Sequence, residues 1–170
     1  MNITSLINQY FEEAAQLRDS IHREPELAFH EFKTSQKLRD FLDKHGIAYR
    51  YPIATTGLLA EIKGKFPGKT ILLRADMDAL PMQENRDHAN CSVIDQKMHA
   101  CGHDGHSAGL CLSAAVLNQI KDELHGTIKF MFQPAEEAIG GAKPMIDEGV
   151  LEGVDMAFGA HLIGSMLEGQ

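Results

Sequence analysis

The segment KMHACGHDGHSAGL (97–110) gathers cysteine, histidine and aspartate side chains in a short, glycine-containing stretch. Cys101 and His103 lie two positions apart, and a thiolate and an imidazole are both good ligands for zinc. In an extended segment, side chains two positions apart share a face, so we expect both residues to bind one metal centre. A helix predicted to begin just after them would favour the thiolate through its dipole.

A pair of adjacent acidic residues offers a second kind of chemistry. Glu136 and Glu137 follow the apolar segment TIKFMFQ (127–133). Neighbouring side chains of extended backbone point to opposite sides, so one carboxylate could bind metal while the other faces substrate and water. Metal-assisted hydrolysis needs two such carboxylates, one that binds the metal and one that transfers protons. A metal lowers the pKa of bound water to about 7, and a nearby carboxylate takes the proton and delivers it to the leaving amine.

Hydrophobic periodicity predicts the elements that position these groups. Helices are expected at about 6–21, 30–45, 107–120 and within 140–152, and strands at 47–54, 56–64, 70–76, 127–133 and 156–162. Pro67 and Gly68 are expected to form a turn before the third strand. Because strands alternate with helices in the second half, the sequence predicts an α/β fold with a mixed, largely parallel sheet flanked by helices.

Three of the predicted strands end in potential metal ligands. Asp76 and Asp78 end one strand, Glu136 and Glu137 follow the next, and His161 lies near the end of the last. Open α/β sheets bind their ligands beyond the carboxyl ends of the strands. If these strands are parallel neighbours, aspartate, cysteine, histidine and glutamate from four distant segments should meet at one edge of the sheet.

Composition limits the classes of partner. The chain has 170 residues and a net charge of −8, and no basic block offsets that charge, which argues against nucleic acid or an anionic membrane as partner. Residues 1–20 lack the basic start and apolar core of a signal peptide. No apolar run approaches the roughly 18 residues of a membrane span. With three cysteines and no export signal, a disulfide framework is not expected, and we predict a cytoplasmic domain.

Simpler interpretations remain open for each of these groups. Cys101 alone could be a buried thiol, the two glutamates could be a solvated pair, and Asp76 could form only a surface ion pair with Arg74. His99 and His106 flank the cluster, where supporting positions at the helix start are expected. The other histidines outside the candidate site are expected to be ordinary residues: His22, His30, His45, His88 and His125. No C-x-x-C or H-E-x-x-H pattern occurs.

Six segments of the chain occur in the same order in a known group of enzymes. They are HREPEL (22–27), LLRADMDALP (72–81), MHACGHDGH (98–106), FQPAEE (132–137), GGAKPMIDEGVL (140–151) and GAHL (159–162). The chain therefore resembles the dinuclear-metal amidohydrolases related to aminoacylase and carboxypeptidase. This group includes hippurate hydrolases, N-acyl-amino-acid deacetylases and indole-acetyl-amino-acid hydrolases. The match extends over nearly the whole chain, and the Cys-Gly-His-Asp-Gly-His block with the later Glu-Glu pair is specific to this branch.

The resemblance implies roles for particular residues. It implies four metal ligands, which are Cys101, His103, Glu137 and His161. It makes Glu136 the general base and Asp78 an aspartate that orients a ligand, and Asp76 falls where some relatives carry a ligating histidine. Two divalent ions are implied, with Zn²⁺ first and Mn²⁺, Co²⁺ or Ni²⁺ also compatible. The implied substrates are N-acyl or N-aryl-acyl amino acids or small peptides.

Members of this group are longer than 170 residues. The resemblance implies that residues 1–170 form the N-terminal part of a zinc-exopeptidase-like catalytic domain. A lid domain, a last histidine ligand and a homodimer surface would then lie outside this sequence. We therefore expect the 170 residues alone to bind metal weakly and turn over little substrate. The alternative hypothesis is a non-catalytic metal-binding or assembly module, in which protein groups fill every coordination position.

Overall fold

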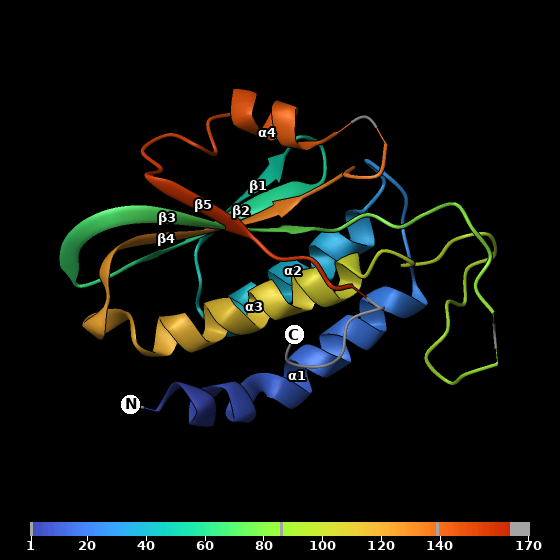
Figure 1. Ribbon diagram of the computed structural model, residues 1–170, viewed down its shortest axis with the longest axis horizontal. Helices are drawn as coiled ribbons and strands as arrows, with labels where there is room; N and C mark the ends of the chain where they lie inside the picture. Colours follow the sequence, from blue (N-terminus) through green and yellow to red (C-terminus); the bar gives the residue numbers. More distant parts are fainter. Residues whose placement is uncertain (1, 86, 139, 164–170) are drawn as a thin grey trace.

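The computed structural model describes residues 2–85, 87–138 and 140–163, and it places one sheet between two layers of helices (Figure 1). The helices are α1 (Ile3–Arg23), α2 (Phe32–Lys44), α3 (His103–Gln119) and α4 (Ala142–Asp147), with a short 3-10 helix η1 (Lys121–Glu123). The strands are β1 (Tyr49–Ile53), β2 (Gly57–Lys63), β3 (Phe66–Asp76), β4 (His125–Gln133) and β5 (Met156–Gly159).

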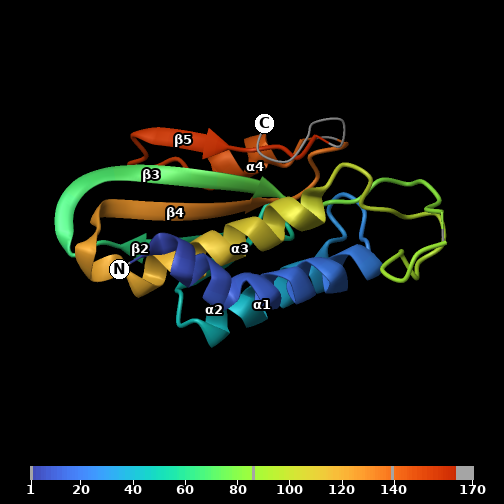
Figure 2. The same ribbon diagram turned by 60° about the horizontal axis from the view of Figure 1, so that its bottom comes forward.

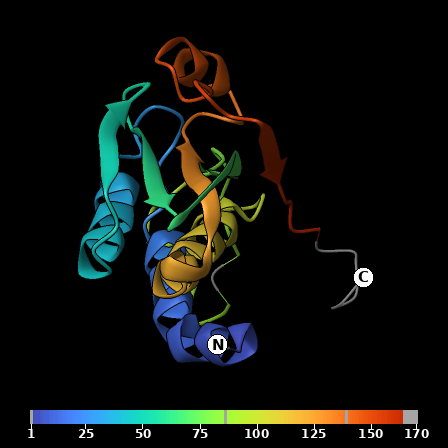
Figure 3. The same ribbon diagram turned by 90° about the vertical axis from the view of Figure 1, so that its left-hand side faces the viewer.

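The five strands lie side by side in the order β1-β2-β4-β3-β5 (Figure 3). β3 pairs in parallel with both β4 and β5. β2 pairs antiparallel with both β1 and β4. Four strands therefore point the same way and only β2 opposes them, which confirms the predicted mixed, largely parallel sheet flanked by helices.

The two faces of the sheet bury different sets of side chains. The long helices α1, α2 and α3 cover one face and α4 covers the other (Figures 1 and 2). Successive residues of a strand point to opposite faces. Phe130 and Phe132 of β4 accordingly belong to the core beneath the three helices. Met131 between them packs on the other side with Met145 of α4.

The helices form close to where the apolar spacing predicts them, although α3 begins at His103, four residues before the predicted start at 107. α1 buries one apolar face made of Leu6, Ala14, Leu17 and Ile21. The side chain of Asn2 accepts a hydrogen bond from the Thr4 amide at 3.0 Å and so caps the first turn. The helix ends at Arg23, before Pro25, because the residue ahead of a proline disfavours the helical conformation. Within the described ranges, none of the helices combines the length and apolarity that a membrane crossing would need.

Two predicted strand boundaries are wrong. β3 already begins at Phe66, so Pro67 and Gly68 lie inside the strand rather than in a turn. The pairing with β4 shifts register between Phe66 and Thr70, and such an irregularity can accommodate a proline that lacks an amide proton. β5 ends at Gly159, which leaves His161 in the loop beyond it. The last difference matters for the site, because a loop can turn the histidine toward the neighbouring strand ends.

Truncating a core aromatic side chain tests this packing. We expect Phe130→Ala to lower the free energy of unfolding by about 3–5 kcal/mol, because Phe130 is fully buried and the neighbouring side chains cannot refill its volume. Urea denaturation followed by circular dichroism measures the change. The matched control is Phe11→Ala on α1, where the ring is 59% exposed and the expected change is within about 0.5 kcal/mol. Equal losses in the two variants would contradict this packing.

Candidate metal centre

The carboxyl ends of three parallel strands meet at one edge of the sheet. Asp76 at the end of β3 pairs with Gln133 at the end of β4, and Arg74 pairs with Gly159 at the end of β5. The segments that follow these strands therefore emerge together, and α3 begins beside them, close to the same edge (Figure 2). The strand-end convergence predicted from the sequence is confirmed.

The predicted ligands gather around His103. Donor atoms of Cys101, His103 and His161 all lie within 4.8 Å of one another, and those of His103, Glu136 and Glu137 form a second such group. The Cys101 Sγ atom lies 3.3 Å from the His161 Nε2 atom. The structure therefore places the four predicted ligands and the predicted base within two groups that share one imidazole. The structure shows that these five side chains lie close together, and their roles as ligands and base remain predictions.

The imidazole of His103 fits a bound cation. The ring is fully buried, and its Nε2 atom has no hydrogen-bond partner among the described residues. That atom lies 3.6 Å from a carboxylate oxygen of Asp76 and 3.6 Å from one of Glu137. The other ring nitrogen, Nδ1, faces an oxygen of Asp78 at 3.3 Å. Histidines that bind metals commonly donate their second nitrogen to a carboxylate in this way, so Nε2 is the nitrogen available to a metal.

The electrostatics of the two groups also favour a cation. Burial and the neighbouring Glu137 carboxylate raise the pKa of the Cys101 thiol to about 11. Burial opposes protonation of His103, but the hydrogen bond to Asp78 and the charge of Asp76 raise the pKa of the imidazole above its ordinary value. The negative charge of the neighbouring carboxylates contributes to both upward shifts. A divalent ion would offset that charge and bind the thiolate in place of the thiol proton.

The two glutamates lie in a turn, and the prediction of extended backbone with diverging carboxylates is wrong. The preceding residue, Ala135, has a positive φ of 53°, so the chain bends at the end of β4. The Ala135 amide donates to a buried oxygen of Glu31 at 2.9 Å. The Glu137 amide donates to Asp78 at 2.9 Å. These contacts hold the turn from both sides and bring both Glu136 and Glu137 toward the same imidazole.

The segment that carries Cys101 and His103 is also not extended. His103 is the first residue of α3, and Gly102 before it has a φ of +80°, a conformation that side chains other than glycine rarely adopt. The prediction that alternation along an extended chain aligns the two ligands is therefore wrong. They converge because the left-handed residue between them redirects the chain into the helix.

Asp76 makes a buried ion pair and not a surface one. Its side chain is 1% exposed and lies 2.8 Å from Arg74 and 2.6 Å from His106 Nδ1. Burial opposes ionisation, but the hydrogen bond from His106 and the charges nearby lower the pKa of Asp76 below its ordinary value. The Nε2 atom of His106 accepts the Leu162 amide at 2.8 Å. Asp76 and His106 thus tie the loop after β5, which carries His161, to the end of β3.

Residues 105–109 read Gly-His-Ser-Ala-Gly, which matches the G-x-S-x-G pattern of serine nucleophiles. The structure excludes that role for Ser107. Its side chain is fully buried in α3 and its hydroxyl donates to the Asp76 carbonyl oxygen at 2.7 Å. That pattern requires an exposed hydroxyl on a sharp strand-to-helix turn.

Buried polar residues support the site from outside the two ligand groups, and two of them, Glu31 and His22, were not expected from the sequence. Glu31 is fully buried, and burial raises its pKa, yet it lies more than 100 positions from the turn it holds. His22, expected to be ordinary, bonds Asp104 at the start of α3. His99 is buried with both ring nitrogens unpaired among the described residues, and burial lowers its pKa to about 4. His99 also borders a cavity of about 450 Å³ that reaches Cys101 and His161. The sequence had placed His99 at a supporting position beside the cluster, and for His22 only the HREPEL segment offered a signal.

The chain is similar to known proteins in both sequence and fold. Residues 72–170 match the family model described as Peptidase family M20/M25/M40. The chain is 43% identical over 163 residues to an IAA-amino acid hydrolase ILR1-like 4 of Arabidopsis thaliana, covering 96% of the chain and 37% of that protein. It is 46% identical over 146 residues to an N-acetylcysteine deacetylase of Bacillus subtilis, covering 85% of the chain and 38% of that protein.

A solved structure shares the fold. The crystal structure of the Bacillus subtilis YXEP protein, described as a dinuclear metal binding peptidase from the M20 family, superposes with a TM-score of 0.90 at 42% identity. The superposition covers 94% of this chain and 45% of that one. The chain thus spans about two fifths of the length of the curated relatives above, 37% and 38%.

Proposed function

Because the chain belongs to Peptidase family M20/M25/M40, we propose that it supplies the metal-binding part of an enzyme that hydrolyses amide bonds. The proposed substrates are N-acyl or N-aryl-acyl amino acids or small peptides. The names of two relatives support this class, since one is a deacetylase of N-acetylcysteine and the other a hydrolase of IAA-amino acids. In this proposal residues 1–170 are the first part of the catalytic domain, and alone they turn over little substrate.

One observation carries the proposal. Three groups of potential ligands share His103, which lies with Cys101 and His161, with Asp76 and His106, and with Glu136 and Glu137. Glu136 is a carboxylate beyond the four predicted ligands. Four of these residues would hold the ions, namely Cys101, His103, Glu137 and His161. A divalent ion bound there supplies Lewis acidity and makes water a stronger nucleophile at neutral pH. The thiolate favours Zn²⁺, while the carboxylates also suit Mn²⁺, Co²⁺ or Ni²⁺.

The roles of the side chains follow from their contacts. Asp78 holds the His103 ring and the Glu137 amide, so it fixes two ligands from different segments. Glu136 lies beside them and is exposed, so its carboxylate can reach both water and substrate. Glu136 takes a proton from the attacking water and delivers it to the nitrogen of the leaving amine, as a general base and then a general acid.

A non-catalytic metal-binding module is the alternative. A structural site fills its coordination positions with protein groups and has no use for a further carboxylate. The nearness of Glu136 to the ligand group therefore favours the hydrolase over the module.

A hydrolysis panel on the natural full-length protein tests the proposal. The panel contains N-acetyl-amino acids, hippurate and dipeptides, and the release of free amino acid is measured by a ninhydrin-type assay. We expect release from the N-acyl compounds, at least 100-fold slower after chelation, and recovery on adding Zn²⁺ or Mn²⁺. Metal binding without cleavage of any compound would favour the module. Cleavage that survives complete removal of metal would contradict the proposed mechanism.

A further inference from the structure

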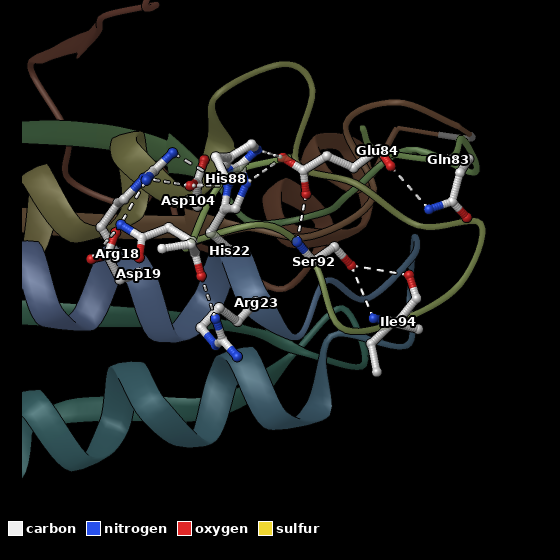
Figure 4. A network of polar contacts seen from close by, with 12 residues as sticks. Arg18, Asp19, His22, Arg23, Gln83, Glu84, His88, Ser92, Ile94 and Asp104 are labelled. Atoms are coloured by element: carbon white, nitrogen blue, oxygen red, sulfur yellow. Dashed lines mark hydrogen bonds and ion pairs between the residues drawn. The ribbon is translucent and has the colours of Figure 1, made fainter. Parts of the chain in front are cut away.

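His22 of α1 lies between two buried carboxylates from distant parts of the chain. Its Nδ1 atom is 2.8 Å from an oxygen of Asp104 and its Nε2 atom is 2.9 Å from an oxygen of Glu84 (Figure 4). The three residues are between 1% and 5% exposed. Carboxylates only accept hydrogen bonds, so both ring nitrogens donate and the ring carries a positive charge. The hydrogen bond to Asp104 accordingly raises the pKa of His22.

The two carboxylates belong to two different segments that meet at α1. Asp104 is the second residue of α3 and directly follows His103. Glu84 lies in the long loop after β3, where its second oxygen accepts the Ser92 amide at 2.5 Å. Arg18, one turn before His22 on α1, donates from Nε to the same Asp104 oxygen at 2.7 Å. Two cations of α1 therefore face two carboxylates, one on each segment (Figure 4).

The first turn of α3 has no side-chain cap of its own, so contacts from other segments must fix its position. Its N-cap is Gly102, which offers no side chain to cap the free amides, and no side-chain cap hydrogen bond is made there. Glycine is also the residue with the greatest backbone freedom. The bonds from α1 to Asp104 anchor the helix start on the α1 side, while His103, His106 and Ser107 anchor it to the end of β3 and the residues that follow. Cys101 and His103 stand on the two sides of that glycine.

We propose that His22 is a positioning residue for the metal centre, acting through Asp104 to set the placement of His103 relative to Cys101. This inference rests on the proposed function, because it takes these two side chains as metal ligands. His22 itself touches neither of them in the described contacts, and it acts through one hydrogen bond and the short stretch of backbone beside it.

Substitutions at His22 can remove one of its two hydrogen bonds and keep the other. Asn places its amide near the position of Nδ1 and can keep the bond to Asp104. Gln reaches the position of Nε2 and can keep the bond to Glu84. If the bond to Asp104 positions the ligands, His22→Asn should retain metal affinity better than His22→Gln, whichever variant is more stable. His22→Ala loses both bonds and should be the weakest.

The experiment titrates the natural full-length protein, freed of metal, with Co²⁺. The readouts are the dissociation constant and the thiolate-to-cobalt charge-transfer absorption of Cys101. We expect His22→Ala and His22→Gln to weaken Co²⁺ binding by about 10- to 100-fold, as other residues that orient metal ligands do, and to alter that absorption. His22→Asn should stay within about 5-fold of the natural protein.

His45→Ala is the matched control. His45 follows α2 and bonds Glu13 of α1 at 3.2 Å, so its loss breaks a similar His–Glu contact away from the start of α3. It should lower the unfolding temperature without changing the cobalt affinity or spectrum. The inference about His22 would be wrong if His22→Gln kept the cobalt affinity and spectrum of the natural protein, or if the Asn and Gln variants bound cobalt equally well. The proposed metal centre would be unaffected by either result. A natural protein that binds no Co²⁺ through a thiolate would overturn the proposed metal centre, and this inference with it.

Discussion

Replacing Glu136 with glutamine is expected to lower kcat for an N-acyl amino acid by about 10²- to 10⁴-fold, the usual contribution of general acid–base catalysis. Glutamine matches glutamate in size but cannot accept and return a proton at neutral pH. Metal content should remain that of the natural protein, since Cys101, His103, Glu137 and His161 are untouched. The measurements are steady-state kinetics and elemental analysis of the purified full-length protein.

The neighbouring residue supplies the matched control. Glu137→Gln makes the same chemical change one position along the same turn, beside the same imidazole. Because Glu137 is the proposed ligand, this variant should lose metal as well as activity, and added metal should restore part of that activity. Added metal should restore none in Glu136→Gln. If Glu136→Gln kept most of its activity, or if it lost metal as Glu137→Gln does, the assignment of the base would be wrong.

The sequence predicts the location of the site well because that location depends on strand direction. Asp76, Glu136 and His161 each follow an apolar run of strand length, and parallel strands bring such positions to one edge of a sheet. This inference needs only the pattern of each segment and the direction of its strand. The predicted location of the site is therefore unchanged when a strand boundary is wrong by several residues, as it is for β3, which begins early at Phe66.

The local geometry was less predictable, because it depends on single backbone angles. Spacing alone cannot reveal that Gly102 is left-handed or that Ala135 bends the chain before the glutamates. Both segments were therefore expected to be extended, and both are turns. In each case the turn brings the side chains closer together than extended backbone would.

The supporting contacts could not be predicted from pattern at all. Asp104 lies 82 positions from His22, and Glu84 lies 62 positions from it. A polar residue on a helix is usually exposed, so nothing in the spacing of α1 marks His22 as buried. Such contacts depend on how α1 packs along α3, which is a property of the assembled core. They are visible only once the fold is known.

The second large effect is expected from Cys101→Ser, which should remove the stabilisation that metal gives to the folded state. A ligand at about 100 times its dissociation constant adds about 2.7 kcal/mol to the free energy of unfolding. A serine hydroxyl replaces the soft thiolate that zinc prefers. If affinity falls 100-fold, the same zinc concentration adds only about 0.4 kcal/mol. Denaturant unfolding of the full-length protein with and without Zn²⁺ measures the difference.

Cys111→Ala distinguishes a lost ligand from a general loss of stability. Cys111 is fully buried in the core beneath the three helices, so its truncation should lower the free energy of unfolding by about 1 kcal/mol. That loss should be the same with and without zinc, because Cys111 belongs to neither ligand group. Cys101→Ser should show the opposite pattern, with little change in the metal-free protein and a large loss of the zinc effect. If zinc stabilised the Cys101→Ser variant as much as the natural protein, the thiol would not be a ligand.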